Sequence, residues 1–162
     1  MIKLNKMKSV LLFTFAMLIS GFAYSQNYKT AIGFKGGFPG FGALNIKHAL
    51  GSSTAIEASI GGGRNFLWFQ GLFEINKDMG SGFNWYYGIG GDIGTWNNNY
   101  NYKYRDNYYN GAYGGVDGVI GIEYTFAAIP FNIAVDATPT VRLFPYVGFG
   151  IYGNIALRFA IK

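Results

Sequence analysis

The chain has 162 residues, enough for one domain, and only 13% of them are charged, about half the share in an average soluble domain. Its formal net charge is +5, but beyond residue 25 there are ten Lys and Arg against eight Asp and Glu. This near balance argues against a polyanionic partner such as nucleic acid. The absence of cysteine and the single histidine leave no support for disulfides or a zinc site.

The N-terminal segment has the pattern of a cleavable signal peptide. Three lysines precede an apolar run from Val10 to Ile19, and small residues follow up to Ser25. The run is shorter than the roughly 20 residues of a membrane-spanning helix, which disfavours the alternative of a retained anchor helix. The sequence therefore predicts a signal peptide at 1–25, cleaved after Ser25, and one exported domain at 26–162.

Beyond residue 26, apolar and polar residues alternate with a period of two, which is the pattern of β-strands. No apolar stretch there reaches the length of a membrane-spanning helix. In the last segment, odd-numbered residues are apolar apart from Gly153, and the even-numbered ones are small or polar. The pattern predicts eight strands at Thr30–Gly37, Phe41–Leu50, Thr54–Gly62, Phe66–Asn76, Phe83–Trp96, Ala112–Phe126, Phe131–Leu143 and Val147–Lys162.

Six of the seven predicted connections are short: Phe38–Gly40, Gly51–Ser53, Gly63–Asn65, Lys77–Gly82, Ala127–Pro130 and Phe144–Tyr146. The remaining one, Asn97–Gly111, is a long polar segment without periodicity. Pro139 falls inside the seventh strand and lacks the N–H of a ladder hydrogen bond. We expect either a bulge at Thr138–Thr140 or, preferably, a ladder that frays there near a barrel rim.

An even number of long alternating strands in an exported, charge-poor chain favours a closed membrane barrel, which satisfies every backbone polar group in lipid. The alternative, a soluble ligand-carrying barrel, would turn its apolar face inward. The charged residues fall on the glycine-rich mixed face, which suits the crowded interior of an eight-stranded barrel. We therefore predict a lumen charge network of Lys35, Lys47, Glu57, Glu74, Asp92, Asp117, Glu123, Asp136, Arg142 and Arg158.

Aromatic residues gather near both ends of the predicted strands, as in barrels whose aromatic girdles mark the two membrane interfaces. One group is Trp85, Tyr124, Phe126, Phe131 and Phe159, and the other is Phe41, Trp96, Tyr113, Phe144, Tyr146 and Phe149.

With these features, Asn27 to Lys162 resembles the small eight-stranded outer-membrane barrels of Gram-negative bacteria, the OmpA/OmpX-like family. The resemblance implies an antiparallel up-and-down barrel in outer-membrane lipid, a monomer, inserted by the outer-membrane assembly machinery. Members of the family often end in an aromatic residue that this machinery reads. Here the chain ends in Lys162, and Phe159 takes that place.

Two motifs suggest chemistry, but their contexts disfavour it. Gly148–Gly153 matches the dinucleotide-binding GxGxxG pattern, yet it lies within a predicted strand and no helix follows, so no cofactor is expected. His48 has Ser52, Ser53 and Ser59 nearby in the sequence, and some outer-membrane barrels that act on lipid A resemble hydrolases or acyltransferases with a His and a Ser. His48 falls on the predicted lipid face near a rim, so we expect an interfacial histidine and no catalytic site.

The sequence thus predicts a protein with a structural or surface-interaction role, without catalytic, cofactor or metal sites. Its termini would face the periplasm and the Asn97–Gly111 loop the exterior, as a possible binding surface for an extracellular ligand. The alternatives are a narrow ion-conducting pore and a lipid-modifying enzyme that uses His48. The residues of the predicted surface loop that would make such contacts are Tyr100, Tyr102, Lys103, Tyr104, Arg105, Asp106, Tyr108 and Tyr109.

Overall fold

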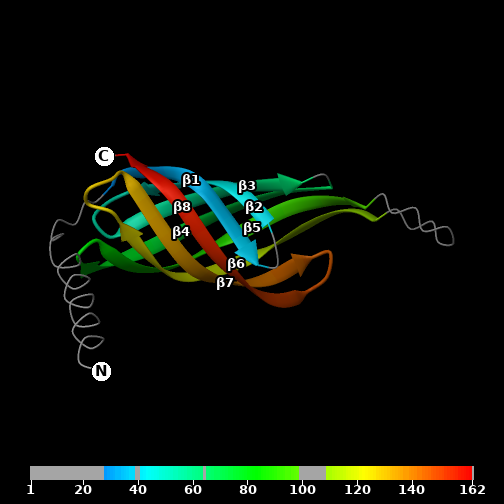
Figure 1. Ribbon diagram of the computed structural model, residues 1–162. Helices are drawn as coiled ribbons and strands as arrows, with labels where there is room; N and C mark the ends of the chain where they lie inside the picture. Colours follow the sequence, from blue (N-terminus) through cyan, green and yellow to red (C-terminus); the bar gives the residue numbers. More distant parts are fainter. Residues whose placement is uncertain (1–27, 39–40, 64, 99–108, 162) are drawn as a thin grey trace, which may run out of the picture.

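The computed structural model describes residues 28–38, 41–63, 65–98 and 109–161. Within them, eight strands form one closed antiparallel barrel in the order of the sequence, and β8 returns to pair with β1 (Figure 1). This is the up-and-down barrel that the sequence predicts. The strands are β1 (Thr30–Phe38), β2 (Phe41–Ala49), β3 (Thr54–Gly63), β4 (Phe66–Gly80), β5 (Phe83–Asn98), β6 (Tyr109–Thr125), β7 (Phe131–Phe144) and β8 (Gly148–Ile161).

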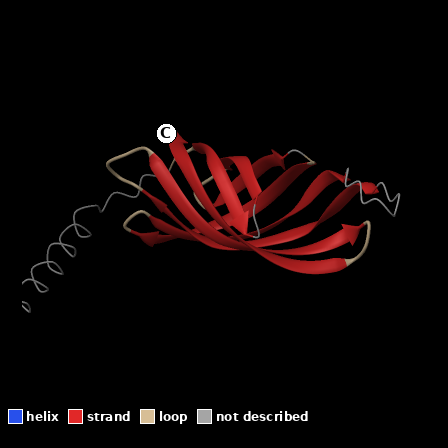
Figure 2. Ribbon diagram, turned by 45° about the vertical axis from the view of Figure 1, so that its right-hand side comes forward, coloured by secondary structure: helices blue, strands red, loops and turns tan. Residues whose placement is uncertain are grey.

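The barrel has two distinct ends. The first described residues and the end of β8 lie at one end, here called the terminal end, together with the β2–β3, β4–β5 and β6–β7 connections (Figure 1). At the opposite end, the loop end, β5 and β6 project beyond their neighbours. Every regular element of the described residues is a strand (Figure 2). No helix among these residues is long and apolar enough to span a membrane.

Closure of the barrel rests on the seam between β1 and β8. Nine residue pairs join the two strands, from Thr30↔Ile161 at the terminal end to Phe38↔Gly153. The backbone N–H of Lys29 also donates to the carbonyl of Ile161 at 3.0 Å. Because the first and last described strands pair along the whole of β1, the sheet has no free edge there.

The β4–β5 connection is tighter than the sequence predicts. Residues Lys77 to Gly80, predicted as part of a turn, instead continue β4, with a register shift between Asp78 and Gly80. Gly80, Ser81 and Gly82 have positive φ angles of 83°, 55° and 85°, and the Asp78 carboxylate accepts the Gly80 N–H at 2.7 Å. Gly80 and Gly82 adopt these angles without steric cost, so the chain can reverse direction within a few residues. The alternation of apolar and polar residues does not reveal such a short turn.

The long polar connection is also shorter than predicted, because β5 and β6 extend into both of its ends. Asn97 pairs with Asn110, and Asn98 pairs with Tyr109. Asparagine and tyrosine carry no apolar alternation, so the paired stem gave no period-two signal. The rest of the predicted surface loop, residues 99–108, lies outside the described residues.

Pro139 corrects another expectation, because it lies in the middle of β7 and not at a rim. It pairs with Ile151 of β8. On the β6 side, Asp117↔Thr140 and Ile120↔Ala137 share one register, so there is no bulge at Thr138–Thr140. No pair joins Thr138 or Pro139 to β6, however, so the ladder is interrupted there as expected, although away from a rim. The proline ring packs on Gly118, whose absent side chain leaves room for it: a Cβ there would lie 3.2 Å from the Pro139 Cγ.

Polarity across the wall is inverted relative to a soluble protein. Large apolar side chains are exposed around the outer wall of every strand, including Ile120 at 55% and Ile155 at 63%. Buried polar and charged side chains outnumber buried apolar ones among the described residues. Buried apolar residues form two small clusters, one of Leu72, Tyr86, Val119, Ala134 and Ala156 and one of Tyr28, Ala31 and Ala160.

The predicted aromatic groups are placed differently at the two ends. At the terminal end, Phe131 and Phe159 are exposed on the outer wall and meet edge to face, with ring centroids 5.9 Å apart. At the loop end, Trp96 stacks on Tyr113 at 5.0 Å, and Tyr113 lines a cavity in the lumen. Their position near a strand end predicts an outer girdle for Trp96 and Tyr113. The alternation of their strands, however, places both on the inner face.

Some lumen glycines are required by the close approach of neighbouring strands. A Cβ at Gly90 in β5 would overlap the carbonyl oxygen of Gly71 and the Cα of Leu72, whereas a Cβ at Gly71 would meet nothing within 4 Å. We therefore expect Gly90→Ala to lower the free energy of unfolding by about 1–3 kcal/mol. The matched Gly71→Ala change should alter it by less than about 0.5 kcal/mol. Urea titration of the barrel in lipid vesicles would measure both, and equal effects would contradict the assignment.

Candidate functional site: the charged lumen

All ten charged residues of the predicted network face the interior of the barrel. Their strands alternate in and out, so each charge shares the inner face with small or polar neighbours. Eight of them are buried, and Asp92 and Arg142, near the loop end, are partly exposed as whole residues, although the Asp92 side chain itself is only 4% exposed. The structure divides the ten into a central group of seven and a loop-end group of three, Asp92, Asp117 and Arg142.

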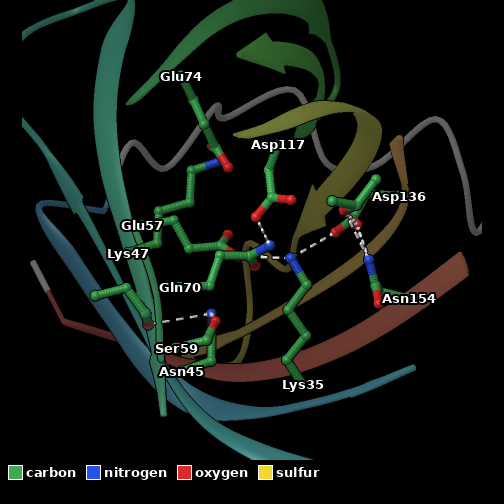
Figure 3. A network of polar contacts seen from close by, with 12 residues as sticks. Lys35, Asn45, Lys47, Glu57, Ser59, Gln70, Glu74, Asp117, Asp136 and Asn154 are labelled. Carbon is green, nitrogen blue, oxygen red and sulfur yellow. Dashed lines mark hydrogen bonds and ion pairs between the residues drawn. The ribbon is translucent and has the colours of Figure 1, made fainter. Parts of the chain in front are cut away.

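Lys35 of β1 and Arg158 of β8 meet on Glu57 of β3 in the middle of the lumen (Figure 3 shows Lys35 and Glu57). The Lys35 ammonium lies 2.7 Å from one Glu57 oxygen and 3.0 Å from Asp136, and the Arg158 guanidinium binds the other Glu57 oxygen. Arg158 also donates to Asn45 and to Asn132. Lys35 and Arg158 therefore bind acceptors on three other strands, β2, β3 and β7.

Lys47 of β2 forms a second centre toward the terminal end. Its ammonium lies 2.7 Å from Glu74, 3.0 Å from Glu123 and 2.8 Å from the Asn76 side-chain oxygen. It also sits 4.1 Å from the centroid of the Tyr86 ring. Neither Glu74 oxygen has an aligned hydrogen bond, so the contact with Lys47 is an ion pair held by charge alone.

The two centres are joined into one network. Arg158 approaches Glu123 at 3.7 Å and thereby links the Glu57 and Lys47 centres. Asp136 is fixed by neutral donors as well as by Lys35: the Tyr86 hydroxyl at 3.0 Å, the Thr138 hydroxyl at 3.2 Å and the Asn154 amide. With four acids and three bases all buried, the central group carries one negative charge in excess when fully ionised.

Tyr28 belongs to the network although the sequence gave no sign of it. Its hydroxyl donates to Glu123 at 2.9 Å, and the ring is buried. Burial raises the pKa of the Tyr28 phenol well above its ordinary value, and the neighbouring Glu123 charge raises it further. The residue precedes β1, and its even number would place it on the outer face of that strand. Alternation therefore could not find it.

The loop-end group is more open. Arg142 lies 3.3 Å from Asp92 Oδ2, which also accepts the Trp68 indole N–H at 3.1 Å. The Arg142 guanidinium lies 4.3 Å from the centroid of the Tyr113 ring. Asp117 has only neutral donors, the Gln70 amide at 2.7 Å and the Thr140 hydroxyl at 2.6 Å.

Two cavities lie on either side of the central network. The loop-end cavity has a volume of about 110 Å³ and is lined by residues that include Asp92, Asp117 and Arg142. The terminal-end cavity has a volume of about 300 Å³, and Tyr28 and Lys47 are among its lining residues. Lys35, Glu57 and Arg158 line neither one. Their side chains lie between the two cavities, where Glu57 pairs with both Lys35 and Arg158.

A search of solved structures finds the same architecture. The N-terminal β-barrel domain of Pseudomonas aeruginosa OprF matches with a TM-score of 0.62 over 83% of this chain and 100% of that one, at 13% sequence identity. The chain has the fold of an OmpA-like barrel. No family model and no curated protein matches its sequence.

The residues of this chain that suggested chemistry are not brought together. His48 Nδ1 is hydrogen-bonded to the Thr30 hydroxyl at 2.8 Å, on the outer wall near the terminal end. Ser59 lies on the opposite, inner face and accepts a hydrogen bond from Asn45 at 2.9 Å. Ser52 and Ser53 are exposed in the β2–β3 turn. No serine among the described residues is therefore hydrogen-bonded to His48.

Cofactor and metal sites lack the expected geometry. The glycines of the Gly148–Gly153 motif lie within β8, where no helix N-terminus can receive a phosphate. Within the described residues, no group of three or more His, Cys, Asp or Glu side chains could hold a metal ion.

Proposed function

We propose that this chain is an outer-membrane β-barrel protein with a structural or surface-interaction role and a lumen closed by its own charges. One observation carries the proposal: the wall is apolar outside and charged inside. Exposed side chains such as Val135, Ile151 and Leu157 form a continuous apolar surface around the strands. Water would make such a surface prone to aggregation, whereas lipid solvates it.

Cell fractionation tests this proposal directly. The full chain should be exported with loss of residues 1–25 and should fractionate with the outer membrane, as a monomer whose gel mobility shifts on boiling. Its folding there would depend on the assembly machinery, with Phe159 as part of the signal. Recovery of the folded protein in the soluble periplasmic fraction would overturn the proposal.

The direction of the chain gives a second test. β5 ends at Asn98 and β6 begins at Tyr109, at the end of the barrel opposite the termini. With the terminal end in the periplasm, segment 97–111 is proposed to lie at the cell surface and to contact an extracellular ligand. Trypsin added to intact cells should then cut at Lys103 or Arg105 and leave the barrel folded. Cleavage only after the outer membrane is broken would contradict this orientation.

The alternative of a narrow ion-conducting pore has some support from the two cavities, because a pore needs an opening at each end of the lumen. Between them, however, Glu57 forms ion pairs with both Lys35 and Arg158 inside the lumen. We therefore expect the purified barrel to show no steady single-channel conductance in planar lipid bilayers. A stable conductance that changes when Glu57 is replaced by Gln would establish the pore instead.

A further inference from the structure

The loop-end cavity has an aromatic wall that the ion pairs of the lumen do not explain. Phe66 and Trp68 of β4, Tyr113 of β6 and Tyr152 of β8 all line it, and all four are half-buried. They lie near the loop ends of their strands, so the cavity lies toward the loop end of the lumen. Aromatic rings at this position could have been placed outward, toward lipid, but these four point into the lumen.

The charges around this cavity do not balance. Asp92 and Asp117 line it together with a single cation, Arg142, which pairs with Asp92. Among the described residues, no Lys or Arg lies within ion-pair distance of Asp117, whose two bonds come from the neutral Gln70 and Thr140. The cavity therefore carries one negative charge in excess.

One carboxylate oxygen in the cavity also lacks a donor. The Asp92 side chain is only 4% exposed, and its Oδ2 is bonded to Trp68 and Arg142. Its Oδ1 has no hydrogen-bond partner. Gly115 keeps the space beside this oxygen free, because a Cβ there would lie 3.1 Å from Oδ1. A buried acceptor without a donor is rare in folded proteins and calls for an explanation.

We infer that the loop-end cavity binds a small organic monocation, an ammonium group on a compact apolar body. The ammonium N–H would donate to Asp92 Oδ1, and its positive charge would offset the excess negative charge of the cavity. The aromatic rings would contact the apolar body of the ligand and present their faces to the ammonium. A divalent metal ion fits less well, because within the described residues no three His, Cys, Asp or Glu side chains are grouped to hold one.

Three probes of one shape separate charge from apolar contact: benzylammonium, benzyl alcohol and benzoate. Each is titrated by calorimetry into the full barrel, folded in non-ionic detergent, so the result is independent of where the protein resides in the cell. Benzylammonium should bind saturably with one site per barrel, and the other two should bind at least tenfold more weakly, because each lacks the cationic donor.

Substitutions locate the site. Asp92→Asn should weaken benzylammonium binding about tenfold or more, because the charge-assisted hydrogen bond is lost. Asp78→Asn is the matched control, since Asp78 is exposed at the terminal end, and it should leave binding unchanged. Asp117→Asn removes the unbalanced charge without touching the Trp68 and Arg142 bonds, so it tests the site even if Asp92→Asn fails to fold. Binding of the alcohol equal to that of the amine, no saturation at millimolar concentrations, or equal losses for Asp78→Asn and Asp117→Asn would each overturn the inference.

Discussion

Replacement of Arg158 by Met should lower the free energy of unfolding by about 3–5 kcal/mol, because it leaves four buried carboxylates with only two buried cations. Arg158 is 0% exposed, binds Glu57 and approaches Glu123 at 3.7 Å. Without it, the central group would hold four acids against Lys35 and Lys47. Urea titration in lipid vesicles, followed by gel mobility without boiling, would measure the loss.

Two further variants separate charge from packing in this prediction. Lys77→Met removes a cation that is exposed at the terminal end, and it should change stability by less than about 0.5 kcal/mol. Adding Glu57→Gln to Arg158→Met restores the former charge balance of the centre. The double variant should therefore lose less than the sum of the single losses. Strict additivity would show that Arg158 acts through its volume and not through its charge.

Replacement of Ile155 or Ile120 by Arg should largely prevent insertion of the barrel. Both side chains are more than half exposed on the apolar outer wall, at 63% and 55%. A guanidinium facing the middle of the bilayer costs about 2–4 kcal/mol, and less toward the interfaces. Membranes of cells producing each variant would be assayed for folded protein that shifts mobility on boiling.

Ser53→Arg provides the matched control for insertion. Ser53 is exposed in the β2–β3 turn, beyond the apolar band, so the same charge there meets water or headgroups. Its folded level should equal that of the unaltered chain. If all three arginine variants accumulate folded protein equally, the outer wall does not face lipid.

Alternation along the strands was enough to predict the barrel and which face of each strand points inward. Within one strand, a period of two fixes the inner or outer side of each residue once one charge of that strand is placed, so Asp92 and Arg158 could be assigned from sequence. Departures from the pattern occur where local geometry overrides it. At Gly80–Gly82 three consecutive positive φ angles end the strand, and at Pro139 a glycine on the neighbouring strand accommodates the ring.

Partners across the lumen could not be predicted in the same way. Which charges meet depends on the relative height of strands on opposite sides of the barrel, and this follows from the stagger of the whole sheet. Lys47 and Glu123 are 76 residues apart and still lie within 3.0 Å. Tyr28 joins them from outside any strand, and the unpartnered Asp92 oxygen emerges only when all neighbours are in place.

The seam between β1 and β8 also bears on how the barrel folds. Its nine pairs join residues that are far apart in sequence, such as Thr30 and Ile161, so they close the largest loop in the described chain. Contacts of this separation form late and slow the folding rate. Until β8 docks, β1 presents an unpaired edge that can capture a strand of another chain. Folding yield should therefore depend on chain concentration during assembly, although the finished barrel has no edge to offer.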